Sequence, residues 1–110
     1  MEMIECSDFE KVELRTGTIL KVEDFTAARK PAYIIHVDFG ELGIKKSSAQ
    51  ITEMYTKDDL IGKQIIGVVN FPSKQIGPIQ SEFLITGFYS DNGVILAVPD
   101  IKIKNGLKLG

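Results

Sequence analysis

The sequence predicts an all-β fold in which short strands close into a small barrel. Apolar and polar residues alternate along several segments, with the period of two that a half-buried strand requires. Only two short stretches carry helix-capping signals, and no β-α-β rhythm joins the strands. A length of 110 residues suits one hydrophobic core, so we expect residues 1–110 to form a single domain.

The first expected element is a helical turn at "SDFE", where Ser7 can cap and Glu10 can reach back to it. The next segment predicts a strand with one solvated face. One face of this strand would hold Leu14, Thr16, Thr18, Leu20 and Val22, and the other would hold Arg15, Lys21 and Glu23. Residues 26–31 then read as a loop, because Pro31 disfavours a helix before it.

The segment "AYIIHVDF" predicts a second strand, and "GELG" turns the chain into a third, "IKKSSAQ". The second strand would bury Tyr33, Ile35, Val37 and Phe39 on one face. The third strand is polar on much of both faces. It has Lys46, Ser48 and Gln50 on one side, with Lys45, Ser47 and Ala49 opposite. One of these two faces must be solvated.

The second half of the chain predicts one more short helix and two more barrel strands. Thr56 and Asp59 form a capping pattern, and Gly62 can end the helix. "QIIGVVNF" and "EFLITGFY" are apolar on both faces, as central strands would be. "SDNG" predicts a hairpin turn, after which "VILAV" returns toward Pro99. Five strands with a helix between the third and the fourth fit an OB-fold.

The tail "IKIKNGLKLG" lies outside these five strands and has an apolar stripe on one side, with a turn at Asn105-Gly106. An exposed apolar edge would invite aggregation, so we expect the tail to be buried in a symmetric homodimer. The expected interface residues are Ile101, Ile103, Leu107 and Leu109.

Composition excludes several functional classes. The formal charge of −2 argues against strongly charge-driven nucleic-acid binding, although a local basic patch remains compatible with it. No apolar run approaches the roughly 20 residues that span a bilayer, so we expect no membrane insertion. The acidic start lacks the apolar core of a secretory signal. With Cys6 as the one cysteine, the reducing cytoplasm is the expected compartment.

No combination of residues predicts catalysis. His36 is the one histidine and lies within an apolar strand, so we interpret it as a structural or surface residue. Ser47 and Ser48 have neither a glycine elbow nor a nearby base, which makes a nucleophilic serine improbable. The carboxylates are scattered among lysines, as on a solvated surface. We therefore expect a protein that is not an enzyme and that needs no metal or cofactor.

A polar stretch, "NFPSKQ", interrupts two apolar strands and indicates a binding surface. If Phe71 is exposed, it could stack on a base or seat an apolar peptide side chain. The alternative is a plain loop with Phe71 in the core and Lys74 in solvent. We expect Asn70 and Ser81 to hold the loop by hydrogen bonds. The candidate ligand face consists of Lys46, Ser48, Gln50, Asn70, Phe71, Lys74, Ile76, Ser81 and Glu82.

Residues Ser47 to Gly87 resemble the tRNA-binding domain family, which includes C-terminal domains of some methionyl-tRNA synthetases and free-standing tRNA-binding proteins. The shared pattern is a polar strand, a tyrosine before an acidic short helix, "L-x-G-K", an apolar strand ending in Asn, and a Ser-Glu pair. In this chain the pattern falls on Ser47 to Gln50, Tyr55, Asp58 to Lys63, Asn70 and Ser81 to Leu84.

The segments "DFEKVELRTGTILKVEDF", "VDFGELGIKKSSAQIT" and "NGLKLG" resemble one branch of this family, the CsaA-like export-related chaperones. This resemblance runs from Asp8 to Gly110 and implies an OB-fold and a homodimer built by the segments outside the barrel. It further implies binding of unfolded or precursor polypeptides and of the secretion ATPase SecA. The wider family implies tRNA as the alternative ligand, and a plain structural adaptor is a third possibility.

Overall fold

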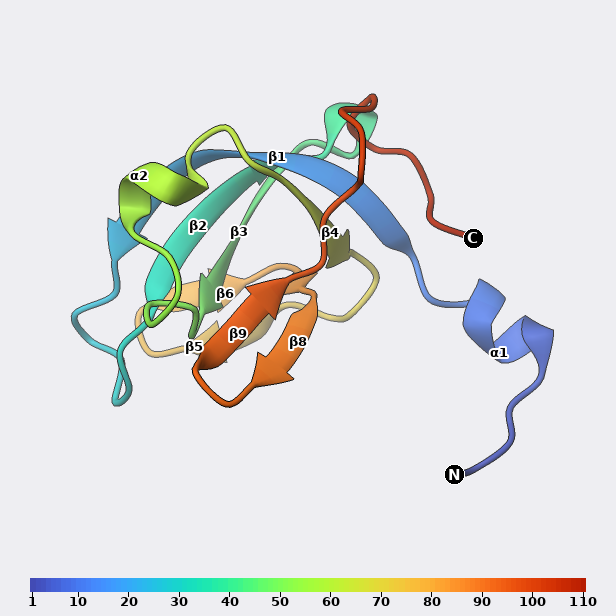
Figure 1. The fold of residues 1–110 in the computed structure, drawn as a ribbon, viewed down its shortest axis with the longest axis horizontal. Coiled ribbons are helices and arrows are strands. Elements are labelled where there is room, and N and C mark those ends of the chain that lie inside the picture. The colour runs from blue at the N-terminus through green and yellow to red at the C-terminus, as the bar shows by residue number, and fades with distance from the viewer.

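A computed structural model describes residues 1–110 as five antiparallel strands curled into a nearly closed barrel, with the order β3-β2-β1-β4-β7 (Figure 1). The barrel strands are β1 (Leu14–Asp24), β2 (Tyr33–Asp38), β3 (Ile44–Ala49), β4 (Gln64–Val68) and β7 (Leu84–Ile85). Two hairpins stand beside them, β5 (Lys74–Ile76) with β6 (Ile79–Ser81), and β8 (Gly87–Ser90) with β9 (Gly93–Leu96). The helices are α1 (Cys6–Glu10), η1 (Gly40–Leu42) and α2 (Lys57–Leu60). This arrangement confirms the all-β class and the OB-fold barrel.

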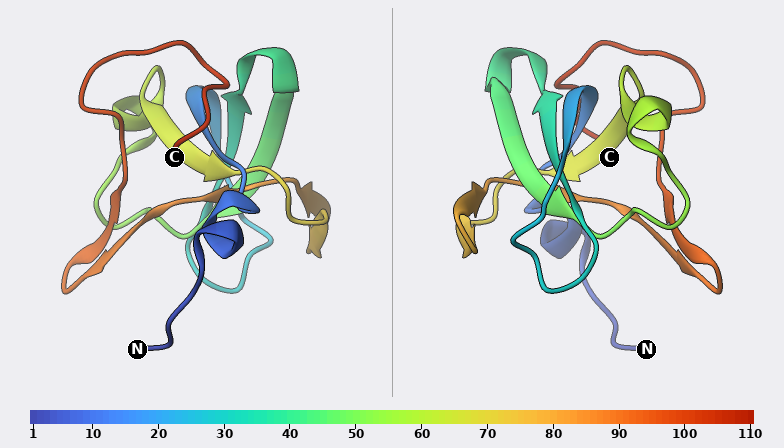
Figure 2. Two further views of the ribbon diagram at one scale, coloured as in Figure 1. Left: turned by 90° about the vertical axis from the view of Figure 1, so that its right-hand side faces the viewer. Right: turned by 90° about the vertical axis from the view of Figure 1, so that its left-hand side faces the viewer.

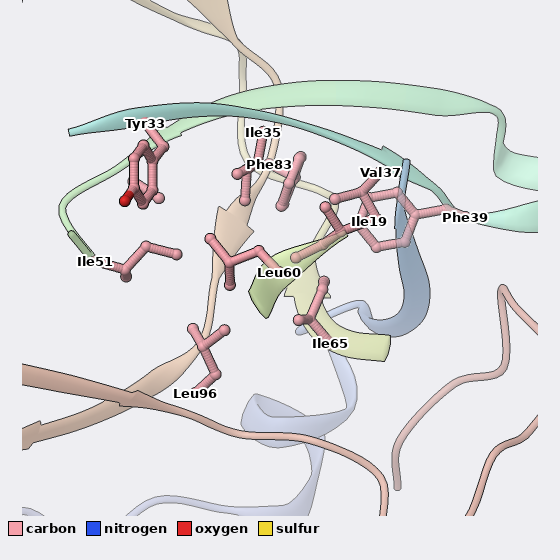
Figure 3. Packing of buried hydrophobic residues seen from close by; sticks show 11 residues of the cluster. Ile19, Tyr33, Ile35, Val37, Phe39, Ile51, Leu60, Ile65, Phe83 and Leu96 are labelled. Atoms are coloured by element: carbon pink, nitrogen blue, oxygen red, sulfur yellow. The ribbon is translucent and has the colours of Figure 1, made fainter. Parts of the chain in front are cut away.

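The hydrophobic core fills the inside of the barrel, and the inward-facing side chains of β2 form a large part of it (Figure 3). The alternation predicted for β2 is confirmed, since Tyr33, Ile35, Val37 and Phe39 are all buried. The Phe39 and Phe83 rings pack edge to face, with centroids 5.0 Å apart. Glycine makes room for them, because a Cβ on Gly67 would lie 2.9 Å from the Phe39 ring. Leu60 of α2 is fully buried in the same cluster.

The longest strand, β1, departs from the expected alternation at Leu20. The pairing register with β2 shifts between Ile19 and Lys21, so Leu20 is the extra residue of a β-bulge. Ile19 is fully buried while Leu20 is exposed, and Val22 packs against the core again. The expectation that Leu20 shares an apolar core face was therefore wrong.

The two helix starts illustrate one correct and one incorrect capping prediction. The Thr56 hydroxyl accepts from the Asp59 N–H at 3.2 Å, and the Asp59 carboxylate accepts from the Thr56 N–H at 2.9 Å. The hydrogen bonds to Thr56 hold the pKa of Asp59 below its usual range. In α1, however, the Glu5 N–H donates to Asp8 at 2.9 Å, so Ser7 lies inside the helix and does not cap it. Neither helix has the length or apolarity to cross a bilayer.

The segment "EFLITGFY" is not one central strand as expected. The chain leaves the barrel at Thr86, whose hydroxyl and N–H both donate to the Ile66 carbonyl, at 2.8 and 3.0 Å. The following β8–β9 hairpin projects away from the barrel (Figure 1), and Phe88 and Tyr89 on it are exposed. The predicted hairpin turn is present, with the positive φ at Gly93.

The tail of residues 101–110 runs beside the first part of β1, along the edge that β2 does not reach. The Thr16 N–H donates to the Leu107 carbonyl at 3.1 Å, and the Leu109 N–H donates to the Leu14 carbonyl at 2.9 Å. Figure 2 shows the tail leaving the β8–β9 hairpin, crossing one end of the barrel and returning to the central strands. Its turn at residues 105–106 is present as predicted.

Candidate ligand face

Strand β3 turns the predicted polar face outward. Ser47 and Ala49 point into the barrel and are buried, while Lys46 and Ser48 are half-buried on the outer side. Gln50 follows the strand and is exposed. Of the two faces that the sequence left open, the solvated one is therefore that of Lys46, Ser48 and Gln50.

Ser81 and Glu82 contact the outer edge of β3. The Glu82 N–H donates to the Lys46 carbonyl at 2.8 Å, and a Glu82 carboxylate oxygen accepts from the Lys46 N–H at 3.1 Å. The hydroxyls of Ser81 and Ser47 lie 2.8 Å apart. These contacts join β3 to the segment before β7, where no strand ladder forms. We call this set of contacts the seam, because it closes the barrel between its two edge strands.

The β5–β6 hairpin extends from the seam and carries Lys74 and Ile76. Lys74 pairs with Ser81 at its base, and Ile76 pairs with Ile79 near its tip. Lys74 is exposed and Ile76 is half-buried. A Cβ on Gly77 would approach the buried Phe25 ring to 3.6 Å, so the tip rests near the loop between β1 and β2.

Phe71 and Asn70 lie at the other end of the same interruption. The Phe71 side chain is 56% exposed, which decides between the two alternatives in favour of a surface residue. The Asn70 amide accepts from the Glu13 N–H at 3.0 Å and donates to the Lys11 carbonyl at 2.7 Å. Asn70 therefore fastens its end of the loop to the segment that enters β1.

The residues predicted for the ligand face therefore do not form one continuous group: some meet at the seam and others lie apart from it. Hydrogen bonds or strand pairing join Lys46, Lys74, Ser81 and Glu82 around the seam, and Ser48 lies two residues from Lys46 on the same strand face. Asn70 is tied elsewhere, and Gln50 makes no side-chain hydrogen bond. Phe71 and Lys74 offer free side chains to a ligand, whereas much of Glu82 and Ser81 is engaged by β3.

Sequence reasoning missed a charged group beside this face, on the outer side of β1 and β2. His36 Nε2 lies 2.7 Å from a Glu23 carboxylate oxygen, and Lys21 Nζ lies 3.9 Å from the same oxygen. The hydrogen bond from His36 lowers the pKa of Glu23, and the charges of Lys21 and Lys46 add to the effect. Alternation had already put Lys21 and Glu23 on one face of β1, but the bulge at Leu20 decides that this face meets His36, and the sequence pattern gives no sign of that pairing.

A second group of exposed side chains is apolar and follows the tail. Ile101 is 71% exposed, and Ile103, Leu107 and Leu109 are each at least 40% exposed. A hollow of about 340 Å³ is lined by Ile103, Leu107 and Leu109 together with Thr16, Ile66, Val98, Pro99 and Lys108. The residues predicted for the dimer interface therefore do form an apolar surface along the tail. In a single chain, that surface is exposed to solvent.

A further hollow of about 460 Å³ lies between α1 and the end of the tail. Phe9 and Ile4 line it on one side and Leu109 on the other. Helix α1 buries none of its residues within the single chain, so its apolar side chains are available to a partner. The signal in the sequence was the apolar Phe9 in a helix too short to form a core of its own, with the apolar Ile4 just before that helix.

No three His, Cys, Asp or Glu side chains gather as a metal site would require. Comparison with known proteins identifies the family instead. The family model described as "Putative tRNA binding domain" matches residues 14–108. Among curated relatives, the methionine–tRNA ligase of Pyrococcus horikoshii is 31% identical over 109 residues. That match covers 99% of this chain and 15% of the ligase, so the chain spans about a seventh of the relative's length.

Two solved structures match over nearly the whole of both chains. The CsaA chaperone protein from Picrophilus torridus has a TM-score of 0.94 and 49% identity, covering 98% of this chain and 100% of that one. The chaperone CsaA from Bacillus anthracis has a TM-score of 0.93 and 44% identity, covering 99% and 100%. The resemblance inferred from sequence motifs is confirmed at the level of family and fold.

Proposed function

We propose that this chain, which belongs to the tRNA-binding domain family, acts as a CsaA-like chaperone that binds unfolded or precursor polypeptides. The observation that carries the proposal is the exposure of Phe71, an aromatic side chain in solvent three residues before the β5–β6 hairpin begins. An exposed aromatic anchor suits apolar side chains of an extended polypeptide. The likeness to two CsaA structures over the full chain supports this assignment.

The proposal includes an assembly and a setting. We expect a homodimer that covers the apolar side chains of the tail, namely Ile101, Ile103, Leu107 and Leu109, with α1 added through Phe9. The expected compartment is the cytoplasm, and SecA is the expected secretion partner. Binding alone accounts for the function, without a catalytic step.

Binding of tRNA is the second candidate. It is favoured by the family model and by the likeness to methionine–tRNA ligases. The lysines available to it on the candidate face are Lys46 and Lys74, and Lys45 is the neighbour of Lys46 in β3. Arg15 does not add to this face, because its guanidinium donates to Glu13 and to the Gly106 carbonyl beside the tail. A dimer would double these charges and could hold an RNA across both subunits.

A salt series separates the two functions. A labelled unfolded polypeptide and a labelled tRNA would each be titrated with the same protein at several salt concentrations. Polypeptide affinity should change little and persist at about 0.3 M salt, since apolar contacts are not screened. Affinity for tRNA should fall steeply, because binding to phosphates releases counterions. Sub-micromolar tRNA affinity at physiological salt, without polypeptide binding, would overturn the chaperone assignment.

Charge-reversal variants sharpen the same test. Changing Lys46→Glu together with Lys74→Glu should weaken tRNA binding far more than polypeptide binding. A matched variant, Lys102→Glu with Lys104→Glu, alters net charge equally on the exposed tail. If both double variants lost the same tRNA affinity, net charge alone would determine binding, and tRNA would not bind specifically at the candidate face.

The dimer is tested by mass in solution. Light scattering at micromolar concentration should give twice the mass of one chain, and Leu107→Asp should lower it, because a carboxylate would be buried in the interface. Lys102→Asp, also on the tail, serves as the control. A single-chain mass for the unaltered protein would refute the dimer.

A further inference from the structure

Three basic side chains lie in a row across the outer face of β1, β2 and β3. Strand pairing sets Lys21 opposite His36, and His36 opposite Lys46. Adjacent strands are about 4.8 Å apart, so the row crosses roughly 10 Å of sheet. The β-bulge is what brings Lys21, and not Leu20, opposite His36.

One carboxylate, that of Glu23, lies among these three side chains. Its oxygen is 2.7 Å from His36 Nε2 and 3.9 Å from Lys21 Nζ, and the charge of Lys46 also acts on it. His36 and Glu23 are 26% and 43% exposed, so the group is accessible to a ligand. The Glu23 carboxylate therefore contacts the basic side chains of this row in the way that the negative group of a ligand would.

The other carboxylates around this face are engaged elsewhere. Asp38, next on the same face of β2, accepts from the Gly40 N–H at 2.8 Å. Glu82 accepts from the Lys46 N–H, and Asp24 pairs with Lys57 at 2.8 Å. The two lysines and Glu23 leave one positive charge on the row when His36 is neutral, and two when it is protonated.

We propose that Lys21, His36 and Lys46 form a phosphate site for an RNA backbone, that Glu23 occupies this site in the free protein, and that protonation of His36 opens it. A row of donors across neighbouring strands suits a polymer that carries one charge at each step. Protonated His36 would neutralise Glu23, which releases Lys21 from its ion pair and leaves Lys21 and Lys46 for phosphate oxygens. This inference rests on tRNA binding, the second candidate function, and adds to it a location and a pH response.

The chain is well suited to a test by pH, because His36 is its one histidine. Imidazoles ordinarily change charge between about pH 5 and 8, where lysines and most carboxylates keep theirs. Labelled tRNA would be titrated at about 0.15 M salt, once near pH 8 and once near pH 5.5. One added phosphate contact predicts affinity about fivefold higher at the lower pH.

Substitutions distinguish the site from a general charge effect. Glu23→Gln should raise tRNA affinity about fivefold near pH 8, because the row gains a charge without acid. Glu10→Gln, on exposed α1 at the other end of β1, changes net charge equally and should leave affinity unchanged (Figure 1). His36→Gln should abolish the pH response, and Lys21→Gln should reduce the slope of log K against log salt by about one. Circular dichroism would verify folding of each variant.

The outcomes separate the site from the function. Binding of tRNA that does not depend on pH, and that Glu23→Gln leaves unchanged, would overturn the phosphate site while tRNA binding stands. A pH response that persists in His36→Gln would also overturn it. Absence of tRNA binding in every variant at both pH values would refute the second candidate function, and the inference with it.

Discussion

The tail and the β5–β6 hairpin both lie outside the five-stranded sheet, but they are held to it in opposite ways. The tail is fixed along its length by backbone hydrogen bonds to Leu14 and Thr16, and by an Asn105 side chain that accepts from Thr18 Oγ1 at 2.8 Å. The hairpin is fixed at its base by the seam, while its other side-chain hydrogen bonds, those of Gln75 and Gln80, stay within it.

This difference indicates different uses. A segment fixed along its length presents the same apolar surface in every molecule, which a symmetric partner needs. The hairpin meets the barrel only at the seam and near Phe25, and it leaves the Lys74 side chain and the preceding Phe71 exposed to ligands of varied sequence. The tail therefore suits an interface between subunits, and the hairpin suits a surface that receives different polypeptides.

Among substitutions in the tail, the seam and the loop, the largest expected effect on stability comes from Gly106 in the tail. This residue has a φ of +89°, and an added Cβ would lie 2.7 Å from the Phe39 carbonyl oxygen. Gly106→Ala should cost about 2–3 kcal/mol in the free energy of unfolding, from backbone strain together with overlap. Denaturant unfolding measures the change.

Gly62→Ala is the control for that variant. Gly62 has a φ of +85°, but nothing lies within 4 Å of an added Cβ. Its substitution should cost about 1–2 kcal/mol from backbone strain alone. Equal losses at Gly62 and Gly106 would show that the close contact between Gly106 and Phe39 adds nothing to the cost.

A smaller effect is expected at the seam. Glu82→Ala removes the acceptor for the Lys46 N–H and should destabilise the protein by about 1 kcal/mol. Glu82→Gln keeps an oxygen in place and should retain most of that stability. If the two variants unfold alike, the carboxylate–backbone hydrogen bond does not hold the barrel closed.

Phe71→Ala should change stability by less than about 0.5 kcal/mol, because the ring is largely in solvent. It should nevertheless weaken binding of the unfolded polypeptide. Phe83→Ala, which empties a core site, should cost about 3–5 kcal/mol in the same assay. A loss of roughly 3 kcal/mol for Phe71→Ala would mean that Phe71 packs in the core.

The smallest effect is an acid sensitivity of the tail. Hydrogen bonds from Lys108, and then from Arg15, hold the pKa of Glu13 below its ordinary value. A lowered folded-state pKa means that the stabilisation exists above the ordinary value and is lost as pH falls through the lowered one. Below about pH 4, the Leu109 N–H should lose protection against hydrogen exchange, measured relative to the intrinsic exchange rate at the same pH. Glu13→Gln should remove this acid dependence, and an unchanged dependence would assign it to another group.

Local patterns predicted the parts of the fold that depend on near neighbours. The burial of Val37 and Phe39 followed from alternation, and the Thr56 cap followed from a residue three positions away. The bulge at Leu20 was not predictable in this way, because it exists only in the pairing of β1 with β2. The exit of the chain at Thr86 likewise depends on a hydrogen bond to Ile66, twenty residues earlier.

Only part of the candidate ligand face was predicted, because the sequence shows which stretches are polar but not which distant residues contact one another. A polar strand face around Lys46 and an exposed loop around Phe71 are visible as composition. The seam is not, because Ser81 meets Ser47 across 34 residues of chain. His36 gave no signal of its charged partners, since Glu23 and Lys46 lie on two other strands.

The tail's place beside β1 also has a consequence for the order in which the protein can fold during synthesis. The Thr16 side chain and the Leu107 carbonyl that it contacts are 91 residues apart. Strand β1 is therefore made before the tail and keeps part of its edge open until the tail has emerged. Contacts between such distant residues form late and slowly, so the nascent chain carries an unfinished sheet edge while the intervening residues are made.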